Sequence, residues 1–323
     1  MKKYDELTLT HYEKESVDDI LTSIHGDDFT RYRNQWYLAN ELKYFPEYPL
    51  YIIIETNNYC NMRCKMCPHS QDSIKLSQKN NISLDIVDKI VEECKVMRVP
   101  SILVGAYTEC LINPQIKEIL TKIKSIGAID NFIITNGLKL TDDVIKTIID
   151  LQYERVYISL DAATPETYKK IRGHDLSKIE RNISHLISAR KNSNSRLPLI
   201  RTSFVVMQEN YHESKLFLEK WQDVVDIVDF QKYVDYVPTE QRNVVPPNIP
   251  YSCPDPFRTL TIRANGDILP CCTSYGESFV LGNLSTTTLQ EAFNSEKMKE
   301  LRKNILSGNM PIPCRYCSQN FHE

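Results

Sequence analysis

The stretch Cys60-Asn61-Met62-Arg63-Cys64-Lys65-Met66-Cys67 holds three cysteines at the spacing C-x3-C-x2-C. A short loop with this spacing can turn three sulfurs toward one point, and three thiolates suit an iron–sulfur cluster whose fourth iron stays open to another ligand. A closed structural zinc site would need a fourth protein ligand nearby. His69 is the only local candidate, and it stands awkwardly one residue beyond a proline. The spacing and the soft thiolate ligands therefore favour a cluster over zinc.

From residue 50 onward, strand-like and helix-like segments alternate along the chain. The first, a β-branched run, predicts a buried strand that leads directly into the cysteine loop. Six such alternations predict parallel strands with helical crossovers, in either an open sheet or a barrel, with ligands at the carboxyl ends of the strands. The predicted strands cover 50–55, 100–105, 131–137, 155–160, 199–206 and 227–231, and the predicted helices cover 84–96, 116–126, 142–151, a segment that opens at 164–166, and 212–221.

The two ends of the chain differ from this alternating part. Residues 1–48 are polar with loosely spaced aromatic residues, which predicts short helices packed on the main domain. Residues 237–250 are rich in Pro, Asn and Thr and predict a linker. Beyond it, an Asn-Gly turn between alternating residues predicts a hairpin over 259–269. We therefore expect an N-terminal extension at 1–48, a main domain at 49–240 and a small module at 251–323.

Composition limits the classes of protein that this chain can belong to. Its 323 residues suffice for one large domain and one small domain. A net charge of −3 gives no indication of a nucleic-acid or membrane partner, and no apolar targeting or membrane-spanning run is present, which predicts a cytoplasmic protein. In that compartment ten cysteines serve more often as ligands or catalytic groups than as disulfides. Cys94, inside a helical pattern, is expected to be a buried thiol.

The cysteine loop and four of the strand ends resemble the radical SAM superfamily, in which the open iron binds S-adenosylmethionine (SAM). That family usually has an aromatic or large apolar residue before the third cysteine, a position that Met66 fills. Glu109 matches the acid that receives the SAM amino group, although Thr108 and Cys110 replace a Gly and a Pro of the family pattern. Thr-Asn-Gly at 135–137 resembles the end of the family's third strand, which implies that Asn136 lies at the SAM site.

The segment from Ser159 to Arg172-Gly173 resembles the family's Ser-x-Asp…Arg-Gly segment. The resemblance implies that Ser159 contacts the ribose or carboxylate of SAM. Asp161 is either a polar neighbour of the ligand or a helix cap. Arg201 suits the SAM carboxylate because a guanidinium binds a carboxylate with two hydrogen bonds, and a structural ion pair is its alternative role. The resemblance also implies a partial (β/α)6 TIM-like barrel for the α/β part of the chain.

The second group of cysteines lies in residues 251–323. Four of these thiolates, taken alone, could hold zinc. Their order, with a hairpin, a Gly266-x4-Cys271 spacing and a C-x2-C pair, resembles the SPASM/twitch extension of radical SAM enzymes. This resemblance implies a small α+β module with one auxiliary [4Fe-4S] cluster, and so two [4Fe-4S] clusters in all. The implied ligands are Cys60, Cys64 and Cys67 for the first cluster and Cys253, Cys271, Cys314 and Cys317 for the second.

Cys272 is the cysteine that this ligand count leaves over. Neighbouring residues of an extended segment point to opposite sides, so Cys272 could face the substrate cavity while Cys271 faces the cluster. A thiol can give its hydrogen to a carbon radical from the opposite face and so invert a stereocentre, as in the aminoglycoside epimerases that this chain resembles. The alternative is that Cys272 is a buried thiol or a substitute ligand.

The resemblance implies reductive cleavage of SAM to a 5′-deoxyadenosyl radical, which removes hydrogen from a substrate carbon. The first hypothesis is epimerisation of a carbon of a sugar, an aminocyclitol or a peptide, with Cys272 as the catalytic hydrogen donor. The alternatives are a dehydrogenase that oxidises a secondary alcohol, a peptide-modifying maturase and, remotely, a zinc-stabilised protein without catalysis. The expected partners are a small-molecule or peptide substrate and an external electron donor such as a flavodoxin or ferredoxin.

Overall fold

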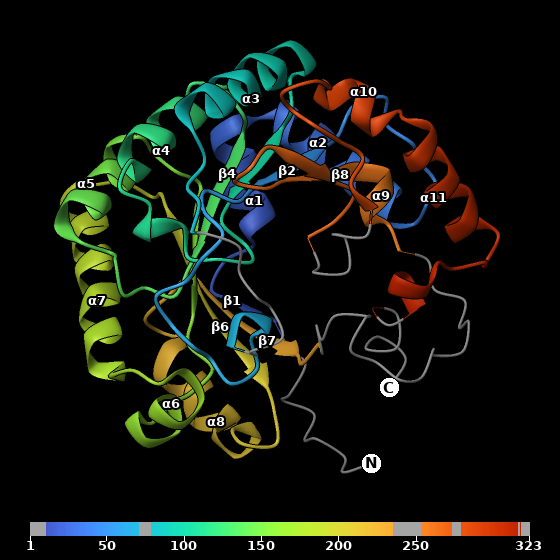
Figure 1. Ribbon diagram of the computed structural model, residues 1–323. Coiled ribbons are helices and arrows are strands. Elements are labelled where there is room, and N and C mark those ends of the chain that lie inside the picture. The colour runs from blue at the N-terminus through green and yellow to red at the C-terminus, as the bar shows by residue number, and fades with distance from the viewer. Residues whose placement is uncertain (1–10, 71–78, 235–252, 273–278, 316, 318–323) are drawn as a thin grey trace.

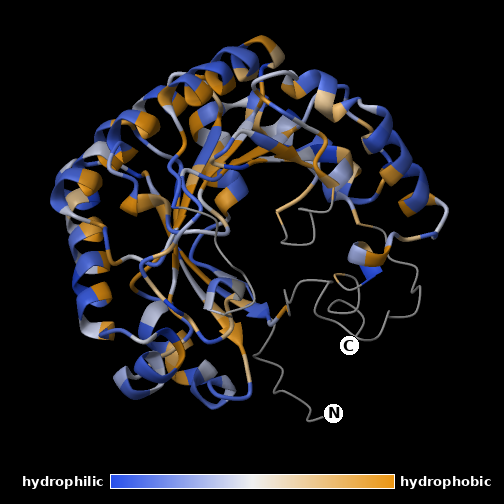
Figure 2. Ribbon diagram, viewed as in Figure 1, coloured by the Kyte–Doolittle hydropathy of each residue, from blue (hydrophilic) through white to orange (hydrophobic). Residues whose placement is uncertain are grey.

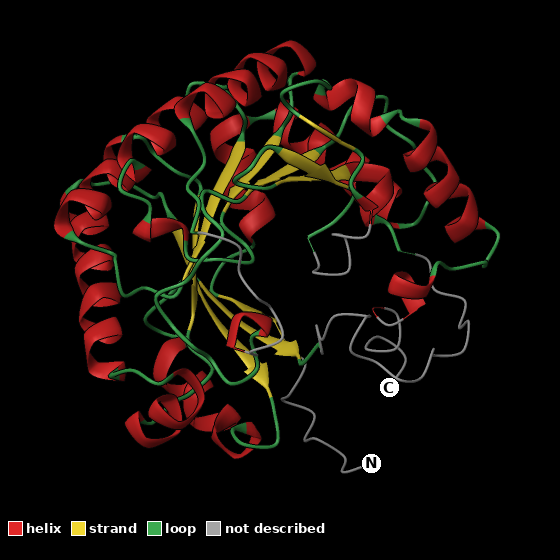
Figure 3. Ribbon diagram, viewed as in Figure 1, coloured by secondary structure: helices red, strands yellow, loops and turns green. Residues whose placement is uncertain are grey.

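The computed structural model describes residues 11–70, 79–234, 253–272, 279–315 and 317, in which helices line the outside of a curved, open sheet (Figures 1 and 3). One sheet of ten strands has the order β1-β7-β6-β5-β4-β3-β2-β8-β9-β10. The strands are β1 (His11–Glu13), β2 (Tyr51–Ile54), β3 (Ser101–Val104), β4 (Asp130–Thr135), β5 (Arg155–Ser159), β6 (Leu199–Val206), β7 (Ile227–Lys232), β8 (Thr259–Ile262), β9 (Asp267–Leu269) and β10 (Gly282–Asn283).

Strands β2 to β7 pair in parallel and in chain order, as the six β/α alternations predict. The sheet of the described residues is open, because β1 lies at one edge and β10 at the other. The predicted α/β class with a partial barrel is therefore confirmed. Three short 3-10 helices, η2 (Pro68–Ser70), η3 (Cys110–Ile112) and η4 (Tyr211–Glu213), follow strand ends or the cysteine loop.

The crossover helices lie where the apolar periodicity predicts them. On α4, for example, Ile116, Ile119, Leu120 and Ile123 share one buried face. Thr164 caps the next predicted helix at its start, with Pro165 in the first turn, which proline's fixed φ favours. The helices are α3 (Leu84–Met97), α4 (Ile116–Lys124), α5 (Asp142–Asp150), α6 (Pro165–Arg172), α7 (Leu176–Asn192) and α8 (Ser214–Trp221).

The N-terminal part closes the amino end of the barrel. The two predicted short helices are α1 (Val17–His25) and α2 (Asp27–Asn40), and they form a core of their own against the amino ends of β2, β5, β6 and β7. Strand β1 pairs antiparallel with β7, with His11 opposite Asp229. The sequence predicts no strand at residues 11–13, because three polar residues carry no period-2 apolar pattern.

The C-terminal part extends the same sheet. The predicted hairpin is present as β8 and β9, and β8 pairs in parallel with β2, with Ile52 opposite Leu260. Helices α9 (Asp255–Arg258), α10 (Leu289–Phe293) and α11 (Glu296–Leu306) accompany it. Leu260 and Ile262 belong to the same apolar core as Ile52. Residues 237–250, for which a linker is predicted, lie outside the described residues.

Hydropathy follows this layering. Figure 2 shows apolar residues along the strands and alternating apolar and polar stripes around the outer helices. Such stripes arise when one face of a helix packs on a sheet and the other faces water. In the part of the chain that the structure describes, none of the helices combines the length and apolar character that a bilayer crossing requires.

Candidate functional site

A pocket of about 300 Å3 lies at the carboxyl ends of the parallel strands. Its walls come from the cysteine loop, from the segment that follows β3, and from the carboxyl-terminal ends of β4, β5, β6 and β7 with residues that follow β4, β5 and β7. One further residue comes from the C-terminal hairpin region. The pocket therefore brings together residues that lie far apart in the sequence. Of the predicted site residues, it is lined by Cys60, Cys64, Cys67, Met66, Glu109, Asn136, Ser159, Asp161 and Cys272.

Hydrogen-bond donors are directed at sulfurs of the cysteine loop. The Met62 N–H donates to Cys60 Sγ over 3.4 Å, and Asn136 Nδ2 lies 3.9 Å from the same sulfur. Arg172 Nη1 lies 3.7 Å from Cys64 Sγ. Burial raises the pKa of all three thiols, that of Cys67 to about 11, so a metal would have to displace the protons on binding. Donors aimed at cysteine sulfurs are typical of iron–sulfur sites.

The donor set around this pocket fits a cluster. Among the described residues, no three Cys, His, Asp or Glu side chains are placed to share one metal ion. In a four-iron cluster each cysteine binds a different iron, so its sulfurs stand around the cluster and need not converge on one point. Three cysteines that line one pocket together with polar side chains match that requirement.

Glu109 is a buried carboxylate at the rim of the same pocket. It accepts hydrogen bonds from Thr135 Oγ1 (2.7 Å), the Asn136 N–H (2.6 Å) and the Leu111 N–H (3.2 Å). Burial raises the pKa of Glu109, and these hydrogen bonds oppose the rise. The donors fix the side chain in place but are neutral, so an ammonium group is a suitable further partner for the carboxylate.

Glu55, which directly follows β2, holds the loop that carries Glu109. Its buried carboxylate accepts from the N–H groups of Ala106 (3.1 Å), Tyr107 (2.7 Å) and Thr108 (3.2 Å), and from Thr108 Oγ1 (2.8 Å). Glu55 is a site residue that none of the sequence motifs predicts. The available signal was an acid directly after a buried strand, at the end where ligands bind.

Asp161 and Arg172 form a buried ion pair at the pocket wall. Asp161 has a left-handed backbone (φ 63°), and its Oδ1 accepts from the Val205 N–H over 2.7 Å. The cap of α6 is Thr164, so of the two roles considered for Asp161 the helix cap is wrong. Ser159, half-buried, lines the pocket beside it. Arg172, the arginine of the Arg-Gly motif near a predicted strand end, contributes its guanidinium to this pocket.

Arg201 lies in the barrel interior, outside the residues that line the pocket. Its guanidinium stands 3.6 Å from the centre of the Tyr157 ring and 3.3 Å from Asp229 Oδ2. Asp229 also bonds His11 (3.1 Å) and Gln231 (2.7 Å). The ion pair considered as the alternative for Arg201 is therefore present, and its contact with the SAM carboxylate stays a prediction that this geometry does not support.

The C-terminal cysteines gather around Cys271. Burial, together with a contribution from the neighbouring Cys271 thiol, raises the pKa of Cys314 and of Cys317 to about 12. The same Cys271 thiol contributes to the raised pKa of Cys253 and of Cys272. Of the two adjacent cysteines, Cys272 lines the pocket that holds the first three sulfurs, and Cys271 does not. This placement agrees with the predicted division of roles, and the ligand assignments themselves stay predictions.

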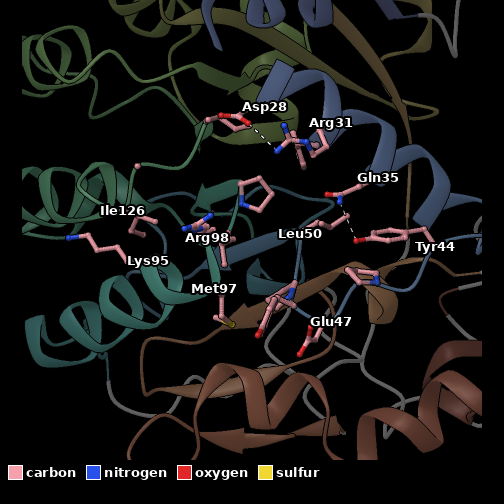
Figure 4. A pocket seen from close by; sticks show the side chains of 18 residues that line it. Asp28, Arg31, Gln35, Tyr44, Glu47, Leu50, Lys95, Met97, Arg98 and Ile126 are labelled. Carbon is pink, nitrogen blue, oxygen red and sulfur yellow. Dashed lines mark hydrogen bonds and ion pairs between the residues drawn. The ribbon is translucent and has the colours of Figure 1, made fainter. Parts of the chain in front are cut away.

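A second cavity, of about 570 Å3, lies at the opposite end of the strands (Figure 4). Its walls come from α2, from the segment before β2 and from the loops that lead into β3 and β4. Arg31 pairs with Asp28 along α2, and Gln35 bonds Tyr44, beside this cavity. None of the predicted site residues lines it. The amino end of parallel strands is the end that serves stability in barrel folds, so size alone does not make this cavity the reaction site.

Two family models match the chain. The model described as the radical SAM superfamily matches residues 54–206, and the model described as an iron-sulfur cluster-binding domain, SPASM, matches residues 253–318. The first match covers the cysteine loop, the segment after β3 and the ends of β4, β5 and β6 that line the pocket, and it stops before β7. The second covers all five C-terminal cysteines.

Curated relatives match part of the chain. A tungsten-containing aldehyde ferredoxin oxidoreductase cofactor-modifying protein of Pyrococcus furiosus is 28% identical over 167 residues, 50% of this chain and 45% of the relative. A GTP 3′,8-cyclase of Alkaliphilus oremlandii is 28% identical over 138 residues, 42% of this chain and 43% of the relative. The chain spans about half the length of the curated relatives it matches.

Solved structures share the fold. BtrN in complex with AdoMet and 2-DOIA is 17% identical, covers 80% of this chain and 87% of its own, and gives a TM-score of 0.54. Streptococcus suis SuiB bound to precursor peptide SuiA is 13% identical, covers 85% and 71%, and gives 0.59. Native anSMEcpe with bound AdoMet is 16% identical, covers 78% and 82%, and also gives 0.59. At these identities the likeness establishes the fold alone.

Proposed function

Because this chain belongs to the radical SAM superfamily and carries a C-terminal SPASM domain, we propose that it is a radical SAM epimerase in which Cys272 donates hydrogen to the substrate. The family assignment brings SAM, a [4Fe-4S] cluster in the first domain and further iron–sulfur chemistry in the second. The proposed substrate carries a C–H bond at a stereocentre, in a sugar, an aminocyclitol or a peptide.

The proposed cofactor contacts are side chains that already share one pocket. Cys60, Cys64 and Cys67 would hold the first cluster, and Glu109 would accept the ammonium group of SAM. When bound, cluster and SAM supply a 5′-deoxyadenosyl radical that removes a hydrogen atom from carbon. The protein's part is to orient the substrate and to exclude water from the pocket.

The placement of Cys272 is the observation that carries the epimerase proposal. Cys272 lines the pocket that contains Glu109 and the loop cysteines, and its neighbour Cys271 does not. Cys272 is also close enough to the C-terminal thiols for Cys271 and Cys317 to contribute to its raised pKa. Burial holds the pKa of Cys272 well above its ordinary value, so the residue keeps its S–H hydrogen at neutral pH. A protonated thiol, and not a thiolate, is what a hydrogen-atom donor requires.

In the proposed hydrogen transfer, Cys272 loses its S–H hydrogen to the substrate and must regain it after each turnover. After a hydrogen atom has left one face of the substrate carbon, the Cys272 S–H bond breaks and a new C–H bond forms on the opposite face. Cys272 is then short of one electron and one proton. An external one-electron donor of the flavodoxin or ferredoxin type supplies the electron, and solvent supplies the proton.

Turnover in D2O tests this proposal. Protein reconstituted without oxygen, supplied with SAM and a reductant, is offered a panel of sugars, aminocyclitols and peptides, and the products are read by mass and NMR. The thiol exchanges with solvent, so an epimerase places one deuterium at the inverted carbon. Cys272→Ala should still yield 5′-deoxyadenosine but no epimer. Cys94→Ala, which removes a buried thiol on α3, should keep the activity. A product without deuterium contradicts the proposal.

Two other activities use the same first step. The substrate panel includes peptides and small molecules because the proteins of similar fold include SuiB bound to a precursor peptide and BtrN in complex with 2-DOIA. In a dehydrogenase the substrate radical would pass a second electron to the auxiliary cluster and a proton to solvent to give a ketone, and Cys272→Ala would remain active. The same experiment therefore distinguishes a dehydrogenase from an epimerase, and the panel distinguishes a peptide-modifying enzyme.

A further inference from the structure

The guanidinium of Arg172 lies against a sulfur of the cysteine loop. Its Nη1 donates toward Cys64 Sγ over 3.7 Å, and both side chains are buried, with 7% of Arg172 and 9% of Cys64 exposed. A charge withdrawn from water is weakly screened, so this one acts strongly on the sulfur beside it.

Asp161 fixes the orientation of that guanidinium. Arg172 donates from both Nε (2.8 Å) and Nη2 to Asp161 Oδ2. Asp161 is itself held by the Val205 N–H on Oδ1 (2.7 Å) and by Asn210 Nδ2 on its backbone carbonyl (2.8 Å). With Nε and Nη2 occupied by the carboxylate, the planar fork directs Nη1 toward Cys64.

The end of α6 is also attached to the cysteine loop through the backbone. The Lys65 N–H donates to the Ile171 carbonyl over 2.8 Å. Lys65 and Ile171 are the chain neighbours of Cys64 and Arg172, whose side chains are in contact. Two adjacent attachments hold the last turn of α6 in fixed register with the loop. The distance between the guanidinium and the sulfur is therefore set by the fold and not by a free side chain.

We infer that Arg172 tunes the reduction potential of the cluster held by Cys60, Cys64 and Cys67, through a charge-assisted N–H···S hydrogen bond to Cys64. Reduction adds one electron from an external donor and breaks no bond in the protein. The negative charge on the cysteine sulfurs increases, so a cationic donor stabilises the reduced state more than the oxidised one. Arg172 therefore acts on the cluster through Cys64. The inference rests on the family's cluster and is independent of the epimerase proposal.

A redox titration of two matched variants tests this role. Arg172→Gln removes the buried charge, and Arg63→Gln removes the same charge from an exposed position next to Cys64. The full chain is reconstituted anaerobically, and the midpoint potential is read by EPR without SAM or substrate. A Cys60→Ala/Cys64→Ala/Cys67→Ala variant gives the auxiliary cluster's signal for subtraction. Arg172→Gln should make reduction roughly tenfold less favourable, about 59 mV more negative for a one-electron couple. Arg63→Gln should shift it by less than half as much.

Arg172→Lys keeps the test decisive if the Gln variant does not retain its cluster. Lysine keeps the charge but has no fork, so it cannot bond Asp161 and Cys64 in the same geometry, and a smaller negative shift is expected. Iron content and circular dichroism establish which variants are folded and loaded. A potential equal to that of wild type in Arg172→Gln, or in Arg172→Lys where only that variant loads, overturns the inference. Equal shifts in Arg172→Gln and Arg63→Gln also overturn it, because they would indicate long-range charge alone.

Discussion

At the scale of the residue, two buried carboxylates in one pocket differ in their hydrogen-bond partners. Asp161 is paired with Arg172, whereas Glu109 bonds the hydroxyl of Thr135 and two backbone N–H groups. Hydrogen bonds from neutral donors fix a carboxylate without compensating its charge. Burial accordingly raises the pKa of Glu109, and a cation beside it would lower that pKa. Of the two acids, Glu109 is the one suited to receive the ammonium group of SAM.

Glu109→Gln should weaken SAM binding about tenfold or more. The change preserves shape but replaces a charge-assisted hydrogen bond, worth about 1.5–3 kcal/mol, with a neutral one. Equilibrium dialysis of SAM against the anaerobically reconstituted protein measures the Kd. Glu92→Gln, at an exposed position on α3, is the control and should bind as wild type does. An unchanged Kd in Glu109→Gln at full iron content would remove Glu109 from the SAM site.

At the scale of the element, side chains at the carboxyl end of one strand hold the loop that follows the neighbouring strand. Glu55 at the end of β2 gathers the N–H groups of 106–108 after β3. Asn57 extends this link, since its Nδ2 donates to the Glu109 carbonyl over 3.0 Å. Neighbouring parallel strands thus fasten each other's loops, and the carboxylate of Glu109 inherits its position from Glu55.

Glu55→Gln should loosen this loop. The amide has one acceptor oxygen and would turn an NH2 group toward backbone donors, so buried N–H groups lose their partner at about 1–3 kcal/mol each. Hydrogen exchange read by mass spectrometry should become faster over 105–109 and stay unchanged over β5. Thr108→Val, which removes a hydroxyl but leaves the three N–H bonds to Glu55, should have a smaller effect. Equal exchange in Glu55→Gln and wild type would show that the loop is held by other contacts.

The elements that the sequence predicts correctly are those with local signals. Each parallel strand is a short β-branched run, and each crossover helix repeats apolar residues every three or four positions. Strand β1 has no such signal, because its place depends on pairing with β7, with His11 opposite Asp229. The parallel pairing of β8 with β2 likewise joins residues that are far apart in the chain. Pairing of this kind is fixed by tertiary packing, which no local window contains.

The site divides in the same way. The cysteine spacing is local and identifies the loop. The contact of Arg172 with Cys64 and that of Glu55 with the loop after β3 cross between elements, and sequence patterns identify neither. Arg201 is the opposite case. Its residue type and its strand both suit binding of the SAM carboxylate, but its guanidinium is already paired with Asp229. Residue type and strand position indicate what can bind, but only the partners of a side chain show whether it is free to do so.

At the scale of the whole molecule, the C-terminal part and the barrel share one sheet. The Leu50 N–H donates to the Arg258 carbonyl and the Glu55 N–H to the Ile262 carbonyl, so the β2–β8 ladder extends beyond both strand ends. Lys89 on α3 reaches the Leu284 carbonyl, which makes a second attachment. Although the two parts match different family models, their backbones are joined along the strand that leads into the cysteine loop.

This continuity predicts that damage on one side spreads to the other. Ile262→Ala on β8 removes a fully buried side chain of the common core and should cost about 2–5 kcal/mol. Because β8 is the hydrogen-bonded neighbour of β2, hydrogen exchange should become faster in both strands together, and in β3 beyond them. Ile305→Ala on α11, a similar loss away from the ladder, should affect α11 first. Faster exchange confined to β8 and β9 would mean that the two parts unfold separately.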